Sequence, residues 1–147
     1  AGATASSALA ALAVICAGPV TAYVRSRERG DEMRGWGQRL GVDVRVADWA
    51  EGARALTAPL VIATTPAGTT DVVATDVPEH PGILFEVLSE PWPTALASAW
   101  SARGGGVVGG LDLLVHQGLL LVERMTGRVP GPLGAMRLAG EAALAAR

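Results

Sequence analysis

The chain has 147 residues, half of them hydrophobic, and its 12 basic and 14 acidic side chains give a formal charge of −2. This balance offers no electrostatic reason to expect nucleic acid or an anionic membrane as a partner. No uninterrupted apolar run approaches the roughly 18 residues of a membrane-spanning helix, and the single cysteine cannot form an internal disulfide, which fits a reducing cytoplasm. We expect a soluble, cytoplasmic chain that folds as one domain, or as one domain and a part.

The first ten residues, AGATASSALA, place small side chains before an apolar run. A helix N-terminus offers free backbone N–H groups, and a turn without bulky side chains lets a pyrophosphate approach them. The segment is similar to the end of the GxGxxG/A turn of dinucleotide-binding folds, with the preceding strand cut away, so we interpret the chain as a fragment. An ordinary Ala/Ser-rich helix gives the same pattern. We set aside a secretory signal, because no basic residues precede the apolar run.

Helical and β-prone segments alternate along the rest of the chain. After the first helix, broken by Gly18 and Pro19, the expected strands cover residues 19–25, 42–46, 60–65, 82–88 and 104–110. The expected helices cover residues 27–40, 48–56, 93–102, 111–128 and 131–147, and residues 67–81 form a loop. Met33, Trp36 and Leu40 fall on one side of their helix, which Gly41 ends.

This alternation predicts an α/β fold: a Rossmann-like, doubly wound parallel sheet followed by C-terminal helices. In the strand order 3-2-1-4-5-6, the strand before Ala1 would be the central one, and it is missing from the chain.

The end of the second strand of this fold indicates which nucleotide binds there. An Asp or Glu at that position accepts hydrogen bonds from the ribose of NAD, whereas this chain has the arginine-rich run VRSRER at residues 24–29. Guanidinium groups bind a 2′-phosphate through charge-assisted hydrogen bonds worth about 1.5–3 kcal/mol each. We therefore predict NADP as the cofactor. A solvated basic turn at a helix start is the alternative interpretation.

Five segments together resemble one family. GATASSALAAL, AYVRSRER, VIATTPAG, FEVLSEPWPTAL and VVGGLDLLVHQGLLLVERMTG, in this order and spacing, are similar to the C-terminal part of shikimate dehydrogenases, particularly the actinobacterial forms. The resemblance implies an N-terminal substrate domain and a C-terminal NADP-binding Rossmann domain. It also implies reduction of 3-dehydroshikimate to shikimate in aromatic amino-acid biosynthesis, with the missing domain and this small molecule as partners.

The resemblance also assigns roles to individual positions. The implied cofactor-binding residues are Ala1, Gly2, Ala3 and Thr4 of the phosphate loop; Arg25, Ser26 and Arg29 at the 2′-phosphate and ribose; Thr64 and Thr65 along the path to the nicotinamide; and Val87 and Gly110 beside it. Ser89 and Gln117 are the implied substrate-binding residues. Val24 replaces the usual Asn of the basic motif, and Ser89 replaces a Tyr found in many members.

Gln117 has a second interpretation. On its helix it could simply extend a polar stripe formed by Asp112, His116 and Glu123.

The family's acid/base pair, a Lys and an Asp, belongs to the N-terminal domain, and this chain contains no Lys. We therefore assign no catalytic residue and no metal ligand here, and we expect the chain alone to be inactive. Residues 1–110 would form the truncated cofactor domain and residues 111–147 the helices that pack on the absent domain. Uncovered leucines there should self-associate, and a homodimer is one form of this. A quinate/shikimate-type relative and a non-catalytic nucleotide-binding module are the alternative functions.

Overall fold

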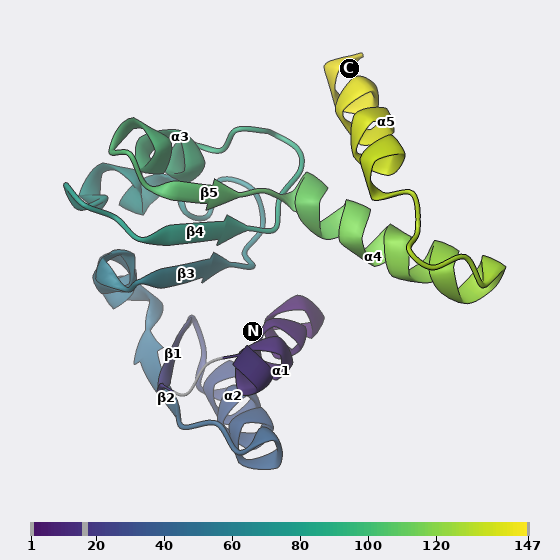
Figure 1. Cartoon of the computed structure of the whole chain (residues 1–147). Helices are drawn as coiled ribbons and strands as arrows, with labels where there is room; N and C mark the ends of the chain where they lie inside the picture. Colours follow the sequence, from purple (N-terminus) through teal and green to yellow (C-terminus); the bar gives the residue numbers. More distant parts are fainter. Residues whose placement is uncertain (1, 16–17, 147) are drawn as a thin grey trace.

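The computed structural model describes residues 2–15 and 18–146. Within these residues, five strands alternate with helical segments (Figure 1). The order is α1 (Ala3–Ile15), β1 (Val20–Val24), α2 (Arg27–Leu40), β2 (Val44–Asp48), η1 (Trp49–Thr57), β3 (Leu60–Ala63), η2 (Asp71–Asp76), β4 (Ile83–Glu86), α3 (Ala95–Ala102), β5 (Gly106–Val108), α4 (Gly110–Thr126) and α5 (Leu133–Ala145). The two η segments are 3₁₀ helices.

The strands form two parallel sheets rather than one. β1 pairs with β2, and β3, β4 and β5 pair in that order. In the part of the chain that the structure describes, β1 and β3 are not paired with each other. Every ladder between described residues is parallel, so the predicted α/β class with its parallel strands is confirmed. The break between β1 and β3 falls where the sequence predicted the missing central strand.

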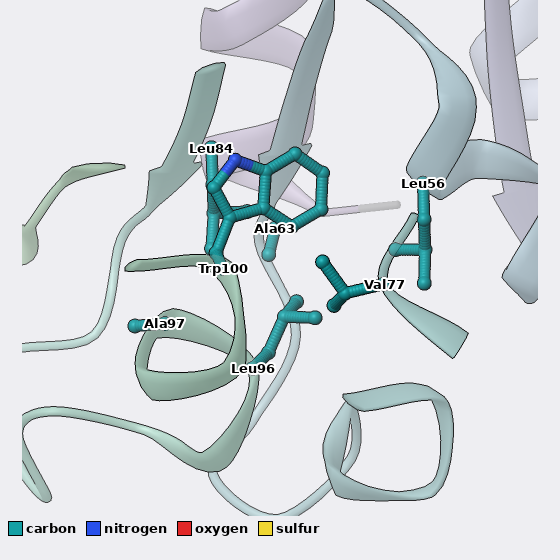
Figure 2. Close-up of a cluster of buried hydrophobic side chains, with 7 residues drawn as sticks. All are labelled: Leu56, Ala63, Val77, Leu84, Leu96, Ala97 and Trp100. Carbon is teal, nitrogen blue, oxygen red and sulfur yellow. The ribbon is translucent and has the colours of Figure 1, made fainter. Parts of the chain in front are cut away.

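The three-stranded sheet is covered by η1, η2 and α3. Trp100 of α3 is fully buried, and its indole Nε1 donates a hydrogen bond to the Gly82 carbonyl oxygen over 3.0 Å. Figure 2 shows the side chains that gather around this ring, and the buried cluster consists of Leu56, Ala63, Val77, Leu84, Leu96, Ala97 and Trp100. This core holds the β3–β4–β5 sheet without help from α1 or α2.

The two-stranded sheet has its own smaller core, built by α1 and α2. Leu9 of α1 and Met33 of α2 are 1% and 5% exposed, and both pack with Val24 of β1. Trp36 and Leu40 lie against the same cluster, which confirms the apolar face predicted for residues 27–40. The Ser26 hydroxyl accepts from the Arg29 N–H at the start of α2, and Gly41 ends the helix with a φ of 70°.

Two predicted boundaries differ from the structure for local reasons. The expected loop at 67–81 contains η2, a single short 3₁₀ segment whose Thr, Asp and Val residues carry no helical period. The expected strand at 42–46 runs instead from Val44 to Asp48, because the Val42 N–H still bonds to the Gly37 carbonyl of the helix before it.

α4 and α5 form a hairpin that extends from the end of β5, away from both sheets (Figure 1). Arg137 of α5 forms an ion pair with Asp112 of α4 over 2.6 Å, and the Gly131 N–H donates to the Glu123 carboxylate over 2.8 Å. Large apolar side chains nevertheless face solvent on this hairpin and its connecting loop, namely Leu114, Leu120, Leu121, Met125, Val129 and Leu138. Across residues 2–15 and 18–146, no helix has both the length and the hydropathy to span a bilayer.

Glu86, the last residue of β4, is a fully buried carboxyl group. The Thr94 hydroxyl donates to its Oε2 over 3.0 Å and accepts from the Ala97 N–H over the same distance, so one hydroxyl joins the strand to the start of α3. Oε1 has no hydrogen-bond partner among the described residues. Burial raises the pKa of Glu86, an effect that the Thr94 hydrogen bond opposes and the charge of Asp71 reinforces.

Two glycines of α2 give a matched test of its packing on β2. A Cβ at Gly37 would lie 2.6 Å from Val44 Cγ2 and 2.8 Å from the Val42 carbonyl oxygen, whereas one at Gly35 would meet only Arg39 Nη1, at 3.7 Å. We predict that Gly37→Ala lowers the free energy of unfolding by about 1–3 kcal/mol through overpacking. Gly35→Ala should raise it by up to about 1 kcal/mol through helix propensity. Thermal unfolding measures both, and equal effects would contradict close packing at Gly37.

The buried carboxyl group predicts a pH dependence. Since the folded pKa of Glu86 lies above its ordinary 4.5, the folded state binds more protons than the unfolded state between those two values, and stability falls as pH rises through that window. The glutamine of Glu86→Gln does not titrate. The melting temperature of this variant minus that of the native chain should therefore increase as pH rises through the window, and stay constant above it. Melting curves at several pH values test this, with the exposed Glu79→Gln as control. A difference independent of pH would contradict the assignment.

Candidate functional site

The candidate binding residues lie at the edge where the parallel strands end. Val24 pairs with Asp48 at the end of β1 and β2, and Ala63 pairs with Glu86 at the end of β3 and β4. The loops that follow these strands carry Arg25 and Ser26 on one side and Thr64 and Thr65 on the other. In open α/β sheets, ligands bind outside this carboxyl edge, near the point where the strand order reverses.

A pocket of about 270 Å³ lies beyond the ends of β1 and β2, and we call it the arginine pocket. Its lining is formed by Val24, Arg25, Ser26, Arg27, Gly30, Arg34, Val46, Ala47 and Asp48. The lining thus contains three arginines and one aspartate, Asp48, whose carboxylate accepts from the Ala50 N–H over 2.8 Å. Arg27 and Arg34 both pair with Asp31, over 3.9 and 2.8 Å. Gly30 lets α2 pack closely on β2 in the lining, because a Cβ there would lie 2.9 Å from Val46 Cγ1. The pocket suits a small anionic group.

The first turn of α2 adds backbone donors to this pocket. The pKa of the exposed Glu28 carboxyl group is lowered by a hydrogen bond from the backbone N–H of Glu28 itself and, to a smaller extent, by one from the Ser26 hydroxyl. This end of the helix therefore stabilises negative charge, as expected for unpaired N–H groups at the positive end of the helix dipole.

Arg25 links the arginine pocket to the rest of the edge. Its guanidinium carbon lies 5.5 Å from the centre of the Trp49 ring, within the range of a cation–π contact. Trp49 in turn lines the larger cavity between the two sheets. The contact between Arg25 and Trp49 therefore joins the lining of the arginine pocket to that of the larger cavity.

The arginines differ in what they contact. Arg29 forms an ion pair with Glu32 over 2.9 Å and does not belong to the pocket lining, so its role at a 2′-phosphate stays a prediction. Arg34, which sequence reasoning missed, lines the pocket and pairs with Asp31 over 2.8 Å. The spacing of Arg27, Gly30 and Arg34 along one helix face was the signal that could have found it.

The larger cavity, which we call the central cavity, has a volume of about 590 Å³ and lies between β1 and β3. Thr64 and Thr65 line it just past the end of β3. The Thr65 hydroxyl is buried and has no hydrogen-bond partner among the described residues. A buried hydroxyl without a partner is costly, so it is available to a ligand or a chain segment placed there.

The phosphate-loop residues stand at the start of α1. Ala1 lies outside the described residues, Gly2 is half-buried, and Ala3 and Thr4 are exposed. The Ser6 N–H bonds to the Gly2 carbonyl, and the hydroxyls of Ser6 and Ser7 turn back onto Ala3. Ala3 and Thr4 lie in the first turn of α1, where backbone N–H groups have no acceptor within the helix.

The remaining predicted positions lie around the ends of β4 and β5. Gly110 is buried at the start of α4, and a Cβ there would lie 2.5 Å from the Val87 carbonyl oxygen. Close packing therefore leaves no room for a side chain at position 110, and Gly110 lies next to Val87. Ser89 is half-buried on the loop after β4, and Gln117 is exposed on α4. Within the described ranges, no three His, Cys, Asp or Glu side chains gather as a metal site.

Comparisons with known proteins find relatives in sequence and in structure. No family model matches the chain. The shikimate dehydrogenase (NADP(+)) of Thermosynechococcus vestitus is 34% identical over 130 residues, which are 82% of this chain and 44% of that protein. The Paramagnetospirillum magneticum enzyme of the same name is 32% identical over 135 residues, 88% of this chain and 48% of that protein.

The crystal structure of Mycobacterium tuberculosis shikimate dehydrogenase superposes with a TM-score of 0.82 at 32% identity, covering 96% of this chain and 53% of that one. The chain therefore spans about half the length of the relatives it matches. The resemblance that the sequence motifs indicated is confirmed: in sequence and in fold, this chain is similar to about half of a shikimate dehydrogenase.

Proposed function

We propose that this chain is the cofactor-binding part of an NADP-dependent shikimate dehydrogenase, which reduces 3-dehydroshikimate to shikimate with NADPH. The observation that carries the proposal is the arginine pocket at the carboxyl ends of β1 and β2. A 2′-phosphate distinguishes NADP from NAD, and guanidinium groups bind phosphate with paired, charge-assisted hydrogen bonds. The relatives named above carry NADP(+) in their names.

The residues present fit such a cofactor along the whole edge. Arg25, Arg27 and Arg34 would hold the 2′-phosphate, with Ser26 and the α2 N-terminus supplying neutral donors. Gly2, Ala3 and Thr4 would hold the pyrophosphate, and Thr64 and Thr65 would follow the path to the nicotinamide. Val87 and Gly110 would flank the nicotinamide, and Arg29 would reach the ribose or phosphate on leaving Glu32. Bound NADPH supplies the hydride, and this chain positions it.

The absence of Lys from this chain suggests which half of the proposed enzyme supplies the acid/base group. The proton of the substrate hydroxyl needs an acid/base group, which the family places on a Lys and an Asp of the N-terminal domain, and this chain has no Lys. Residues 1–110 would therefore bind the cofactor and residues 111–147 would join the substrate domain, in a cytoplasmic enzyme that is inactive as this chain alone.

Substrate contacts would come from Ser89 and Gln117. Ser89 keeps a hydroxyl where many members have a Tyr, but it reaches less far, and this favours a quinate/shikimate-type relative as the second candidate. Steady-state rates of the full-length protein separate the two. Turnover of shikimate supports the first candidate, whereas activity on quinate without activity on shikimate supports the second.

The arginine pocket predicts a cofactor preference that one substitution removes. In the full-length protein, Arg25→Gln should weaken NADPH binding by about 10- to 150-fold, the equivalent of about 1.5–3 kcal/mol for a lost charge-assisted hydrogen bond. NADH binding should change little, because NADH has no 2′-phosphate.

Calorimetric titration with both cofactors measures these affinities, with Arg45→Gln as a matched control. Arg45 is an exposed arginine of β2 that lies beside Asp43, outside the pocket lining. Equal loss of NADPH and NADH affinity would contradict a 2′-phosphate contact at Arg25, and so would native binding that does not discriminate between the cofactors.

The exposed apolar face of α4 predicts self-association of the isolated chain. Leu121 and Met125 are 61% and 84% exposed and lie one turn apart. We propose that the N-terminal half covers this face in the full-length enzyme, so the isolated chain should form dimers or larger species. Leu121→Gln with Met125→Gln should shift it toward monomer in sedimentation velocity, and Ala135→Gln on exposed α5 serves as the control. An isolated native chain that stays monomeric at high concentration would contradict this.

A further inference from the structure

The turn between β5 and α4 is held from two sides. Gly109 and Gly110, which form it, are both buried. The Gly110 N–H donates to the Leu88 carbonyl oxygen over 3.1 Å, and this bond fixes the turn to the segment that follows β4. The six-membered ring of the Trp92 indole lies against the other glycine, since a Cβ at Gly109 would lie 2.8 Å from Trp92 Cη2. Neither position of the turn therefore has room for a side chain.

Asp112 joins the first turn of α4 to these glycines. Its Oδ2 accepts from the Gly109 N–H over 3.3 Å, and its own N–H donates to the Gly109 carbonyl oxygen over 3.1 Å. This reciprocal pair is a capping box, in which a side chain of the first helical turn satisfies the N–H of the residue before the helix. The orientation of the Asp112 carboxylate thus determines how α4 leaves the turn.

Arg137 of α5 holds the second oxygen of this carboxylate. Its Nη1 lies 2.6 Å from Asp112 Oδ1, so the two carboxylate oxygens have separate partners. The two side chains are 38% and 31% exposed, which makes this pair less exposed than the other ion pairs between described residues. An ion pair that is shielded from water is screened less than one at the open surface, so this contact can hold the carboxylate in one orientation.

A second contact brings α5 to the same turn of α4. A Cβ at Gly140 would lie 2.6 Å from Leu111 Cδ1, and Leu111 directly follows Gly110. Arg137 and Gly140 are three positions apart on α5, so they lie on one face of that helix. This face of α5 therefore contacts the first turn of α4 both through an ion pair and through close packing.

We propose that Arg137 is a positioning residue of the cofactor site, because through Asp112 it fixes the Gly109–Gly110 turn. The inference rests on the proposed function, in which Val87 and Gly110 flank the nicotinamide. Arg137 acts through Asp112 and determines how precisely the nicotinamide faces the substrate. It does not determine how tightly NADPH binds, since the arginine pocket and the start of α1 hold the phosphates in that proposal. α5 thereby acts on the cofactor site of its own chain, in addition to any contact with the other half.

The test compares three variants of the full-length protein with the native one. Arg137→Gln removes the ion pair, Arg137→Lys keeps the positive charge, and Arg124→Gln removes an exposed arginine near the other end of α4 as a matched control. NMR of the NADPH-free protein follows the backbone amides of Gly109 and Gly110. Stopped-flow absorbance gives the rate constant for a single turnover of bound NADPH with 3-dehydroshikimate, which does not depend on the fraction of molecules that is folded. Calorimetric titration gives the NADPH affinity.

Arg137→Gln should shift both amides and lower the single-turnover rate constant by about 10- to 100-fold, while NADPH affinity changes by less than about twofold. Arg137→Lys should restore most of the rate, and Arg124→Gln should match the native protein. Unshifted amides in Arg137→Gln would overturn the link to the turn. Shifted amides with an unchanged rate constant, or equal losses of rate and NADPH affinity, would overturn the positioning role.

The same measurements separate this inference from the proposed function. A native protein that transfers no hydride from NADPH to 3-dehydroshikimate would contradict the proposed function. The amide shifts of Arg137→Gln, which need neither cofactor nor substrate, would still decide whether Arg137 fixes the turn.

Discussion

Parallel pairing of strands organises this molecule, because it brings every carboxyl end to the same edge of a sheet. The register that aligns Val24 with Asp48 and Ala63 with Glu86 also aligns the loops that follow them. Arg25 and Ser26 reach one end of this edge and Thr64 and Thr65 the other, although the two pairs are far apart in the sequence. The direction of the strands thus sets where the candidate site lies, and the side chains in the loops set which ligand it can bind.

The same pairing rule explains why the molecule has two cores. Each sheet is covered by its own helical segments, with Trp100 central to one cluster and Leu9 to the other. The central cavity separates them where a parallel strand would connect the two sheets. Leu9 of one cluster and Leu96 of the other both line this cavity. The proposed cofactor site spans this junction, since Arg25 and Trp49 lie between the arginine pocket and the cavity.

Periodicity and capping chemistry predicted most elements, and side-chain partners were the part that the sequence did not determine. The bounds of α2 agree with the prediction, because an apolar face and Gly41 are local signals. η2 was missed because its six residues have no period. Arg29, whose role at the 2′-phosphate stays a prediction, pairs with Glu32, and Arg34, which was not predicted, lines the pocket. Such choices depend on tertiary distances, as does the burial of Glu86, whose charge suggests an exposed position.

The central claim is that the arginine pocket recognises a 2′-phosphate, and a pair of nucleotides that differ only there tests it most directly. Two-dimensional NMR of the full-length protein would follow the backbone amides of Arg25, Ser26 and Gly30 during titration with 2′,5′-ADP or 5′-AMP. We predict large, saturable shifts of these three amides with 2′,5′-ADP and much smaller ones with 5′-AMP, because only the former places a phosphate among the guanidinium groups. Equal shifts with both nucleotides, or shifts that leave these amides unaffected, would contradict the account.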